Sequence, residues 1–311
     1  MDEPSLSVDF AGIPLRTPVV LLSGCVGFGE ELLNLDGFDA EAIGAICLKG
    51  TTLTPRRGNP PHRLAETPGG MLNAIGLQNP GARQVVDEIL PRLMQQNPPF
   101  KLIANISGST VQEYGEVASI FDNSPVDGIE INISCPNVKE GGAAFGADAQ
   151  VAAKVVAAVR RSTRKPVITK LSPNVTDITQ VARVTIEAGS DALSVINTLM
   201  GMAIHLPSRK PILGNIQGGL SGPAIKPVAL LKVWQVFREV GPQGVQILGQ
   251  GGISSTEDAL EFMVVGSSAI GVGTALFKNP HIGQEIAEGM ANYLKQQGIV
   301  NALDLVGSLS I

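Results

Sequence analysis

Residues 245–274, VQILGQGGISSTEDALEFMVVGSSAIGVGT, contain two short apolar runs, and each run ends in a glycine-rich turn. The runs Val245–Gly249 and Ala269–Gly273 have the length and composition of buried parallel strands. Between them, Ser254 and Ser255 stand where the N-cap of a helix belongs. The stretch therefore predicts a strand, a helix and a second strand in succession.

Six further apolar runs precede this unit, and segments with helical spacing separate them. The expected strands are Val19–Ser23, Ala45–Lys49, Leu102–Ser107, Gly128–Ser134, Val167–Leu171 and Ala192–Asn197. The clearest expected helices are Ala149–Arg161, Thr176–Ala188, Ala224–Glu239 and Pro280–Gln296. Eight alternating β and α units predict one α/β domain over residues 1–311, a closed (β/α)8 or TIM barrel. A doubly wound open sheet is the structural alternative.

Two intervals are too long for plain strand-to-helix connections. They cover residues 50–78 and 198–223, and both are rich in Pro and Gly. Long ordered loops usually serve a site. Because each interval follows a predicted strand, we expect both at the catalytic face of the barrel.

The composition excludes several classes of protein. Of the 311 residues, 44% are hydrophobic and 16% are charged, which supplies a large core and argues against disorder. The net charge of −5 is not gathered in blocks, so neither nucleic acid nor a membrane surface is an expected partner. Three widely spaced cysteines, three dispersed histidines and an N-terminus without a signal-peptide pattern indicate a cytoplasmic protein without a metal site.

Polar residues stand at the ends of successive predicted strands. Because these ends converge at one mouth of a barrel, their side chains are expected to meet there. Two lysines at such a place need a partner with negative charge or acceptor atoms, and the direction of Glu130, inside the fourth strand, stays open. The pattern predicts a ligand site. Its members are Ser23, Lys49, Asn105, Asn132, Cys135, Lys170, Asn197 and Thr198.

Glycines after the last two strands indicate a phosphate. Gly251 and Gly252 let the backbone approach a ligand closely, and Gly273 with Thr274 supplies a second set of donors. Loops after strands 7 and 8 often hold a phosphate in this fold. No GxGxxG pattern occurs, which disfavours a bound nicotinamide dinucleotide and favours FMN.

Cys135 follows the fourth predicted strand in the run Asn132–Asn137. Pro136 stops the strand, and the glycines within residues 138–146 are typical of a mobile lid. A thiol near a lysine is suited to proton transfer near neutral pH. Cys135 is therefore the expected catalytic acid/base, whereas Cys25 and Cys47 are interpreted as small buried apolar residues.

These motifs resemble those of class 1 dihydroorotate dehydrogenases along essentially the whole chain. The resemblance rests on residues 23–25, 49–52, 73–81, 132–139, 170–174, 197–198, 218–222 and 251–252. It implies oxidation of dihydroorotate to orotate in the synthesis of UMP. Cys135 would take a proton from C5 of the substrate while a hydride passes from C6 to FMN.

The resemblance also implies which residues hold the two ligands. The pyrimidine and its carboxylate would be held by Lys49, Asn73, Ala74, Ile75, Gly76, Leu77, Asn132, Asn137, Asn197 and Thr198. FMN would be held by Ser23, Lys49, Gly50, Asn105, Asn132, Lys170, Ile196, Gly222, Gly251, Gly252, Gly273 and Thr274. Lys170 would lie near N1 of the flavin, where positive charge stabilises the reduced ring.

Residues 74–79 and 139–146 are similar to subclass 1B. That resemblance implies a homodimer of this chain within a heterotetramer, whose other subunit carries FAD and a 2Fe-2S cluster and passes electrons to NAD. This chain has no dinucleotide fingerprint and too few cysteines for a cluster. The alternatives are a self-sufficient, fumarate-reducing subclass 1A homodimer, a phosphate-binding barrel enzyme without flavin, and a non-catalytic barrel subunit.

Overall fold

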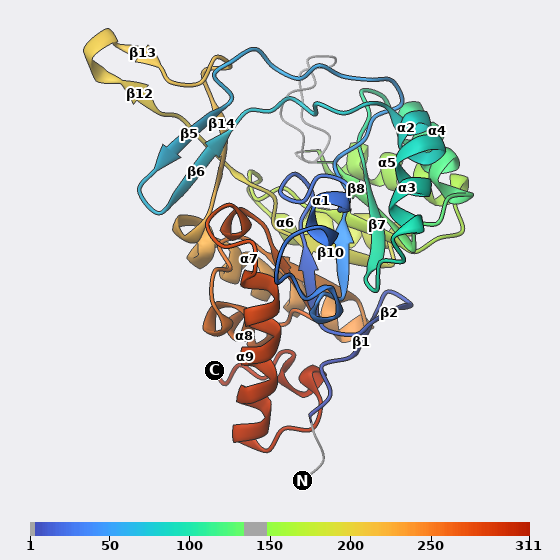
Figure 1. The fold of residues 1–311 in the computed structure, drawn as a ribbon, viewed down its shortest axis with the longest axis vertical. Coiled ribbons are helices and arrows are strands. Elements are labelled where there is room, and N and C mark those ends of the chain that lie inside the picture. The colour runs from blue at the N-terminus through green and yellow to red at the C-terminus, as the bar shows by residue number, and fades with distance from the viewer. Residues whose placement is uncertain (1–3, 134–147) are drawn as a thin grey trace.

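The computed structural model describes residues 4–133 and 148–311, and its centre is a closed barrel of eight parallel strands (Figure 1). Around the barrel the strands follow the order β10, β15, β16, β3, β4, β7, β8, β9. All eight predicted strands belong to it, which confirms the (β/α)8 fold and excludes the open sheet. Their bounds are β3 Val19–Leu21, β4 Ala45–Cys47, β7 Lys101–Ile106, β8 Gly128–Asn132, β9 Val167–Lys170, β10 Ala192–Val195, β15 Gln246–Gln250 and β16 Ala269–Val272.

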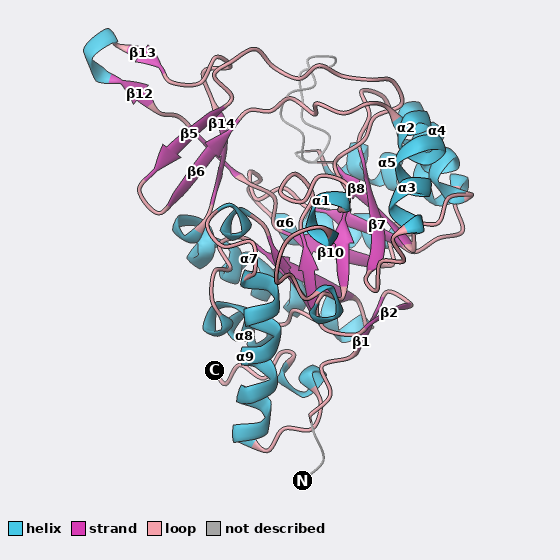
Figure 2. Cartoon of the chain, viewed as in Figure 1, coloured by secondary structure: helices cyan, strands magenta, loops and turns pink. Residues whose placement is uncertain are grey.

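Helices surround the strands on the outside of the barrel (Figure 2). The four predicted helices are present as α5, α6, α7 and α9, and each observed end lies within two residues of the predicted one. Asp177 and Ser255 cap α6 and α8 by accepting the N–H groups of Thr179 and Asp258. The bounds are α1 Glu30–Leu33, α2 Ala82–Gln84, α3 Leu90–Gln95, α4 Val111–Asp122, α5 Ala149–Ser162, α6 Ile178–Glu187, α7 Lys226–Val240, α8 Thr256–Val264 and α9 Ile282–Gln297.

No helix within residues 4–133 and 148–311 is both long enough and apolar enough to cross a membrane.

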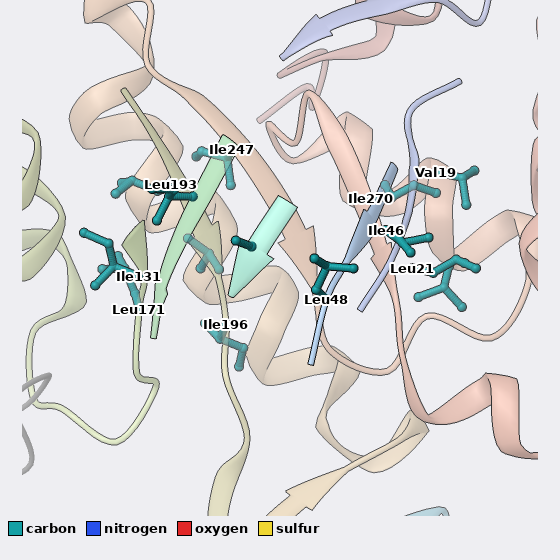
Figure 3. Packing of buried hydrophobic residues seen from close by; sticks show 14 of the residues in the cluster. Val19, Leu21, Ile46, Leu48, Ile131, Leu171, Leu193, Ile196, Ile247 and Ile270 are labelled. Atoms are coloured by element: carbon teal, nitrogen blue, oxygen red, sulfur yellow. The ribbon is translucent and has the colours of Figure 1, made fainter. Parts of the chain in front are cut away.

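Alternate residues of each barrel strand belong to two different cores. One set points outward and packs against the helices, as Figure 3 shows for Val19, Leu21, Ile46, Ile247 and Ile270. The residues between them point into the barrel and form a second apolar cluster with the hairpin of β1 (Val8–Phe10) and β2 (Ile13–Leu15). This hairpin contacts the beginning of β15, where the Gln246 side chain bonds to the backbone of Asp9 and Ala11. It therefore closes the end of the barrel at which the strands begin.

The two long intervals form a sheet of their own, which the sequence did not predict. Four antiparallel strands pair in the order β11, β14, β6, β5, and a small hairpin of β12 and β13 extends from them (Figure 1). Their bounds are β5 Leu64–Thr67, β6 Gly70–Asn73, β11 Leu199–Gly201, β12 Ile204–His205, β13 Lys210–Pro211 and β14 Gly218–Ser221. A side chain at Gly219 would overlap Thr198, so glycine is needed where β14 approaches β11.

Candidate active site

A cavity of about 1400 Å³ lies at the mouth of the barrel and is lined both by the strand ends and by the four-stranded sheet. Every predicted strand-end residue that the structure describes contributes to its wall. Residues of both long intervals, 50–78 and 198–223, also line it, as expected from their place after predicted strands. The lining includes Ser23, Lys49, Gly50, Asn73, Ile75, Gly76, Leu77, Asn105, Asn132, Lys170, Ile196, Asn197, Thr198, Gly222, Gly251, Gly252, Gly273 and Thr274.

One predicted site residue within the described part of the chain, Ala74, is not in this wall. Ala74 is buried in a small apolar cluster with Leu72 and Leu213. Its N–H donates to the Arg63 carbonyl, and its carbonyl accepts from Asn59, so its backbone is also engaged within the loop. Cys135 and Asn137 lie outside the described residues.

A fully buried carboxylate organises the polar side of the cavity. Glu130 points into the barrel, because its neighbours Ile129 and Ile131 belong to the outer core. Its carboxylate accepts the Ser194 hydroxyl at 2.7 Å and the Asn105 side-chain N–H at 2.5 Å. Lys170 Nζ lies 4.0 Å from the same group. The structure thus settles the direction of Glu130 and supplies negative charge beside one of the two predicted lysines.

Lys49 lies in a different electrostatic setting. Burial lowers the pKa of Lys49, and the nearby Cys25 thiol opposes that shift only in part. No carboxylate among the described residues lies close enough to act as its counter-ion. A ligand with negative charge at this point of the cavity would therefore gain a charge-assisted contact with Lys49.

Cys25 occupies the cavity wall, although the sequence suggested only a small buried apolar residue. Burial raises the pKa of its thiol to about 11, while the charges of Lys170 and Lys49 act in the opposite direction. Cys25 is therefore a neutral thiol near pH 7. It is unsuited to the role of base, because the thiolate is the reactive form.

Amide side chains on the strand ends are held by one another and by the backbone. Asn197 Nδ2 donates to Asn132 Oδ1 at 3.3 Å, and the Asn132 carbonyl accepts from Tyr114 and Ser107. The Thr198 N–H donates to Asn197 Oδ1 at 2.8 Å. These bonds fix the asparagines in place before any ligand binds, as a pre-organised polar site requires.

Two side chains in the wall carry polar atoms without a hydrogen-bond partner among the described residues. Asn105 Oδ1 is buried and unpaired, although its Nδ2 donates to Glu130. Oε1 and Nε2 of Gln250 are also buried and have no hydrogen-bond partner among the described residues. Buried polar groups are normally hydrogen-bonded, so these atoms indicate that a polar ligand completes the site.

The glycines after β15 form a close-fitting backbone cradle. Gly252 has a φ of +90°, and a side chain there would come within 2.9 Å of the Gly222 carbonyl and of the Lys226 nitrogen. The N–H groups of Gly251 and Gly252 donate to no acceptor in residues 4–133 and 148–311. Lys226, at the start of α7, is paired with Asp258 at 2.6 Å and with Glu261 at 2.9 Å. Since this nearby cation is already paired, the donors that the cradle offers to an anion are the backbone N–H groups of Gly251 and Gly252.

Glu130, Gln250 and Cys25 are site residues that the sequence reasoning did not assign. A signal was present for the first two, since Glu130 and Asn132 share the parity of one strand face, as do Leu248 and Gln250. Cys25 follows β3 in a turn, where no periodicity indicates direction. Among the described residues, no group of three or more His, Cys, Asp or Glu could hold a metal ion.

Comparison with known proteins gives a consistent result over the whole chain. The family profile for dihydroorotate dehydrogenase matches residues 5–294. The chain is 55% identical over 308 residues to the dihydroorotate dehydrogenase B (NAD(+)) catalytic subunit of Pelobacter propionicus, covering 99% of both chains. Proteins of the same name from Geotalea uraniireducens and Geotalea daltonii are each 54% identical, with 99% and 100% of both chains covered.

Proposed function

Because the chain belongs to the dihydroorotate dehydrogenase family, we propose that it oxidises dihydroorotate to orotate in pyrimidine biosynthesis, as an FMN-dependent and NAD-linked catalytic subunit. The observation that carries this proposal is the cavity itself. Lysines and asparagines from five separate strands line one side of it, and a backbone cradle with unpaired N–H groups lines another. A ligand with a phosphate at one end and a polar ring at the other matches this division.

FMN fits the chemistry of the residues present. Gly251, Gly252, Gly273 and Thr274 would hold the phosphate. Gly222, whose carbonyl lies against Gly252, would border it, and a side chain at Gly222 would come within 2.7 Å of Gly70 Cα. The ring would be held by Ser23, Lys49, Gly50, Asn105, Asn132, Lys170 and Ile196. The unpaired Asn105 Oδ1 is one acceptor that such a ring requires. When bound, FMN supplies the two-electron acceptor of the reaction.

The substrate would bind against the four-stranded sheet and the asparagine strand ends. Asn73, Ile75, Gly76 and Leu77 line the cavity from the first long interval, and Asn132, Asn197 and Thr198 line it from β8 and β10. We also assign Ala74 and Asn137 to the substrate site from the family resemblance. Lys49, which has no carboxylate counter-ion within residues 4–133 and 148–311, would neutralise the substrate carboxylate.

In the proposed reaction, Cys135 accepts the proton from C5 of dihydroorotate, and a hydride leaves C6. The C5–C6 bond of the substrate then becomes the double bond of orotate. Lys170 places a positive charge beside the ring site, and Glu130 with Asn105 and Ser194 holds it there. A fixed charge of this kind stabilises negative charge that develops during electron transfer.

The names of the relatives also support a partner. Each is called a catalytic subunit and carries the designation NAD(+), which we extend to this chain. We propose a homodimer of this cytoplasmic chain within a heterotetramer, in which a second subunit carries FAD and a 2Fe-2S cluster. In this arrangement residues 1–311 act as one FMN-binding domain, and NAD is reduced on the partner.

The experiment is an anaerobic stopped-flow measurement with FMN-loaded protein. Dihydroorotate is expected to bleach the flavin absorbance, and Cys135→Ser is expected to slow the bleaching by about 10²–10⁴-fold while FMN stays bound. Bleaching at the wild-type rate would remove Cys135 from its role. A protein that binds no FMN would refute the proposal as a whole.

A second measurement separates the two kinds of class 1 enzyme. The purified chain is mixed with dihydroorotate and fumarate in the absence of any other protein. We expect only slow turnover, because the electrons leave through the partner subunit. Rapid fumarate reduction would instead assign the chain to the self-sufficient form.

A further inference from the structure

Gln250 is the last residue of β15, and its side chain points into the barrel. Leu248, two residues earlier on the strand, belongs to the inner apolar cluster, whereas Ile247 belongs to the outer core. Gln250 is 1% exposed and lines the cavity. Its Oε1 and Nε2 atoms have no hydrogen-bond partner within the described part of the chain. Buried polar groups are normally hydrogen-bonded, so a bound ligand is the expected source of its partners.

Gln250 lies between the residues proposed to hold the phosphate of FMN and those proposed to hold its ring. The phosphate cradle begins at the next residue, Gly251, and Gly273 continues the cradle on the adjacent strand. The Gln250 side chain lies over Gly271 of β16, where any side chain would come within 2.9 Å of its Cβ. The ring-binding residues are on other strands, namely β3, β4, β7, β8, β9 and β10, or directly after them. Gln250 thus lies on the inner side of the cradle, toward the ring site.

The donor and acceptor atoms of the Gln250 amide indicate which chemical group of the ligand it contacts. A primary amide donates through its nitrogen and accepts through its oxygen, and both atoms are unpaired here. A hydroxyl group also donates and accepts, so it can engage either atom. The segment of FMN between phosphate and ring is a chain that carries hydroxyl groups. A phosphate, which only accepts, would leave Oε1 unpaired.

We propose that Gln250 hydrogen-bonds through its amide to the hydroxylated chain that joins the phosphate of FMN to the flavin ring. Gln250 is then a cofactor-selecting residue, which distinguishes a hydroxylated linker from a plain alkyl linker. This inference rests on the proposed function, since it requires FMN in the cavity.

The test measures the affinity of the apoprotein for two ligands by quenching of flavin fluorescence. One ligand is FMN, and the other is a flavin with the same terminal phosphate on an unsubstituted five-carbon chain. Wild-type protein is expected to bind FMN about 10-fold more tightly than the alkyl analogue. Gln250→Met, which keeps the length of the side chain, is expected to weaken FMN binding about 10-fold and to change binding of the analogue less than twofold.

Gln246→Leu is the matched control, because Gln246 is the same residue type on the same strand. It lies at the opposite end of the barrel, where its amide bonds to Ala11 and Asp9. FMN affinity is expected to be unchanged in this variant.

Equal losses for both ligands in Gln250→Met, or no loss for FMN, would overturn the role of Gln250. If the variant does not fold, the wild-type comparison decides: equal affinity for the two ligands would overturn the inference. Failure of wild-type protein to bind FMN would instead refute the proposed function, so the two failures are distinguishable.

Discussion

The two ends of the barrel interior are built by the same strands but hold different kinds of side chain. Where the strands begin, the inward residues are Val20, Ala45, Ile103, Ile168, Ala192, Leu248 and Ala269, which pack into one apolar cluster under the β1–β2 hairpin. Two residues further along four of these strands stand Asn105, Lys170, Ser194 and Gln250, with Glu130 between them on β8. Two residues along each of these strands therefore separate the part of the barrel that stabilises the fold from the part that is proposed to bind ligands.

This difference shows how the barrel can carry buried charge. The polar end has desolvated groups whose cost must be met by hydrogen bonds within the protein or by a ligand. The apolar end contributes about 1.5–3 kcal/mol for each large side chain that it removes from water. Three variants and one labelling experiment test this division, from the largest expected effect to the smallest.

The first variant is Glu130→Gln, which removes the buried charge beside Lys170. The free energy of unfolding is expected to fall by about 3–5 kcal/mol, because the buried charge of Lys170 would lose the neighbouring Glu130 carboxylate. Urea unfolding followed by circular dichroism measures the change. Combining Glu130→Leu with Lys170→Met should restore most of the stability while weakening FMN binding. If Glu130→Gln alone were as stable as wild type, the contacts of Glu130 with Lys170, Asn105 and Ser194 would not stabilise the polar end of the barrel.

The second variant, Leu248→Ala, affects the apolar end on the same strand as Gln250. A loss of about 3 kcal/mol in the free energy of unfolding is expected from the lost apolar contacts and the cavity left behind. The dissociation constant of FMN should stay within about twofold of wild type, since hydrogen bonds at the mouth are untouched. A large loss of FMN affinity in the folded variant would contradict the separation of the two ends.

Lys49→Met tests the lysine for which the described residues supply no carboxylate counter-ion. Orotate affinity is expected to fall about 10–100-fold, as for loss of one charge-assisted hydrogen bond, and isothermal titration calorimetry measures it. Stability should rise at pH 7, because burial lowers the pKa of Lys49 in the folded state and so disfavours its charged form.

The lowered pKa of Lys49 also predicts how the stability gained by Lys49→Met depends on pH. Between the lowered folded pKa of Lys49 and the unfolded value of 10.5, the unfolded wild-type chain binds more protons than the folded one. Wild-type stability should therefore rise with pH relative to Lys49→Met, and the advantage of the variant should shrink. An advantage that does not change with pH over this range would argue against desolvation of Lys49 as its source.

The smallest expected effect is a difference in reactivity between two thiols. Cys25 lies in the wall of the cavity, and Cys47 belongs to the inner apolar cluster. Burial raises the pKa of Cys25 to about 11 and that of Cys47 well above the ordinary value, and only Cys47 has Glu130 as a further cause. Neither should be alkylated by iodoacetamide near pH 7, and Cys25 should react before Cys47 as the pH rises toward 11. Mass spectrometry of digested protein locates the label. Labelling of Cys47 first would reverse the assignment of the two environments.

The raised pKa of Cys25 also has a consequence for stability. The folded state keeps its proton to a higher pH than the unfolded chain does, so this stabilisation is complete below about pH 9. It is lost as the pH rises from there toward 11.

The amino-acid sequence by itself determined the barrel and the gathering of polar groups at one mouth. Strand length, glycine stops and the spacing of helices are local properties, and parallel strands in a closed barrel bring their ends together by geometry. For that reason Lys49, Asn105, Asn132 and Lys170 could be assigned to one site before any coordinates. The glycine cradle was predicted for the same reason, because Gly251 and Gly252 follow a recognisable strand.

Only the tertiary structure decided which polar groups complete one another. Residues 50–78 and 198–223 form a sheet because β6 pairs with β14, a partner distant in the chain that local periodicity cannot specify. The same holds for Glu130, whose bonds to Ser194 and Asn105 join three strands, and for Ala74, whose side chain packs into a small cluster with Leu72 and Leu213. Gln250 is the clearest case. Its residue type is visible in the sequence, but its unpaired amide exists only because the surrounding strands enclose it without offering a partner.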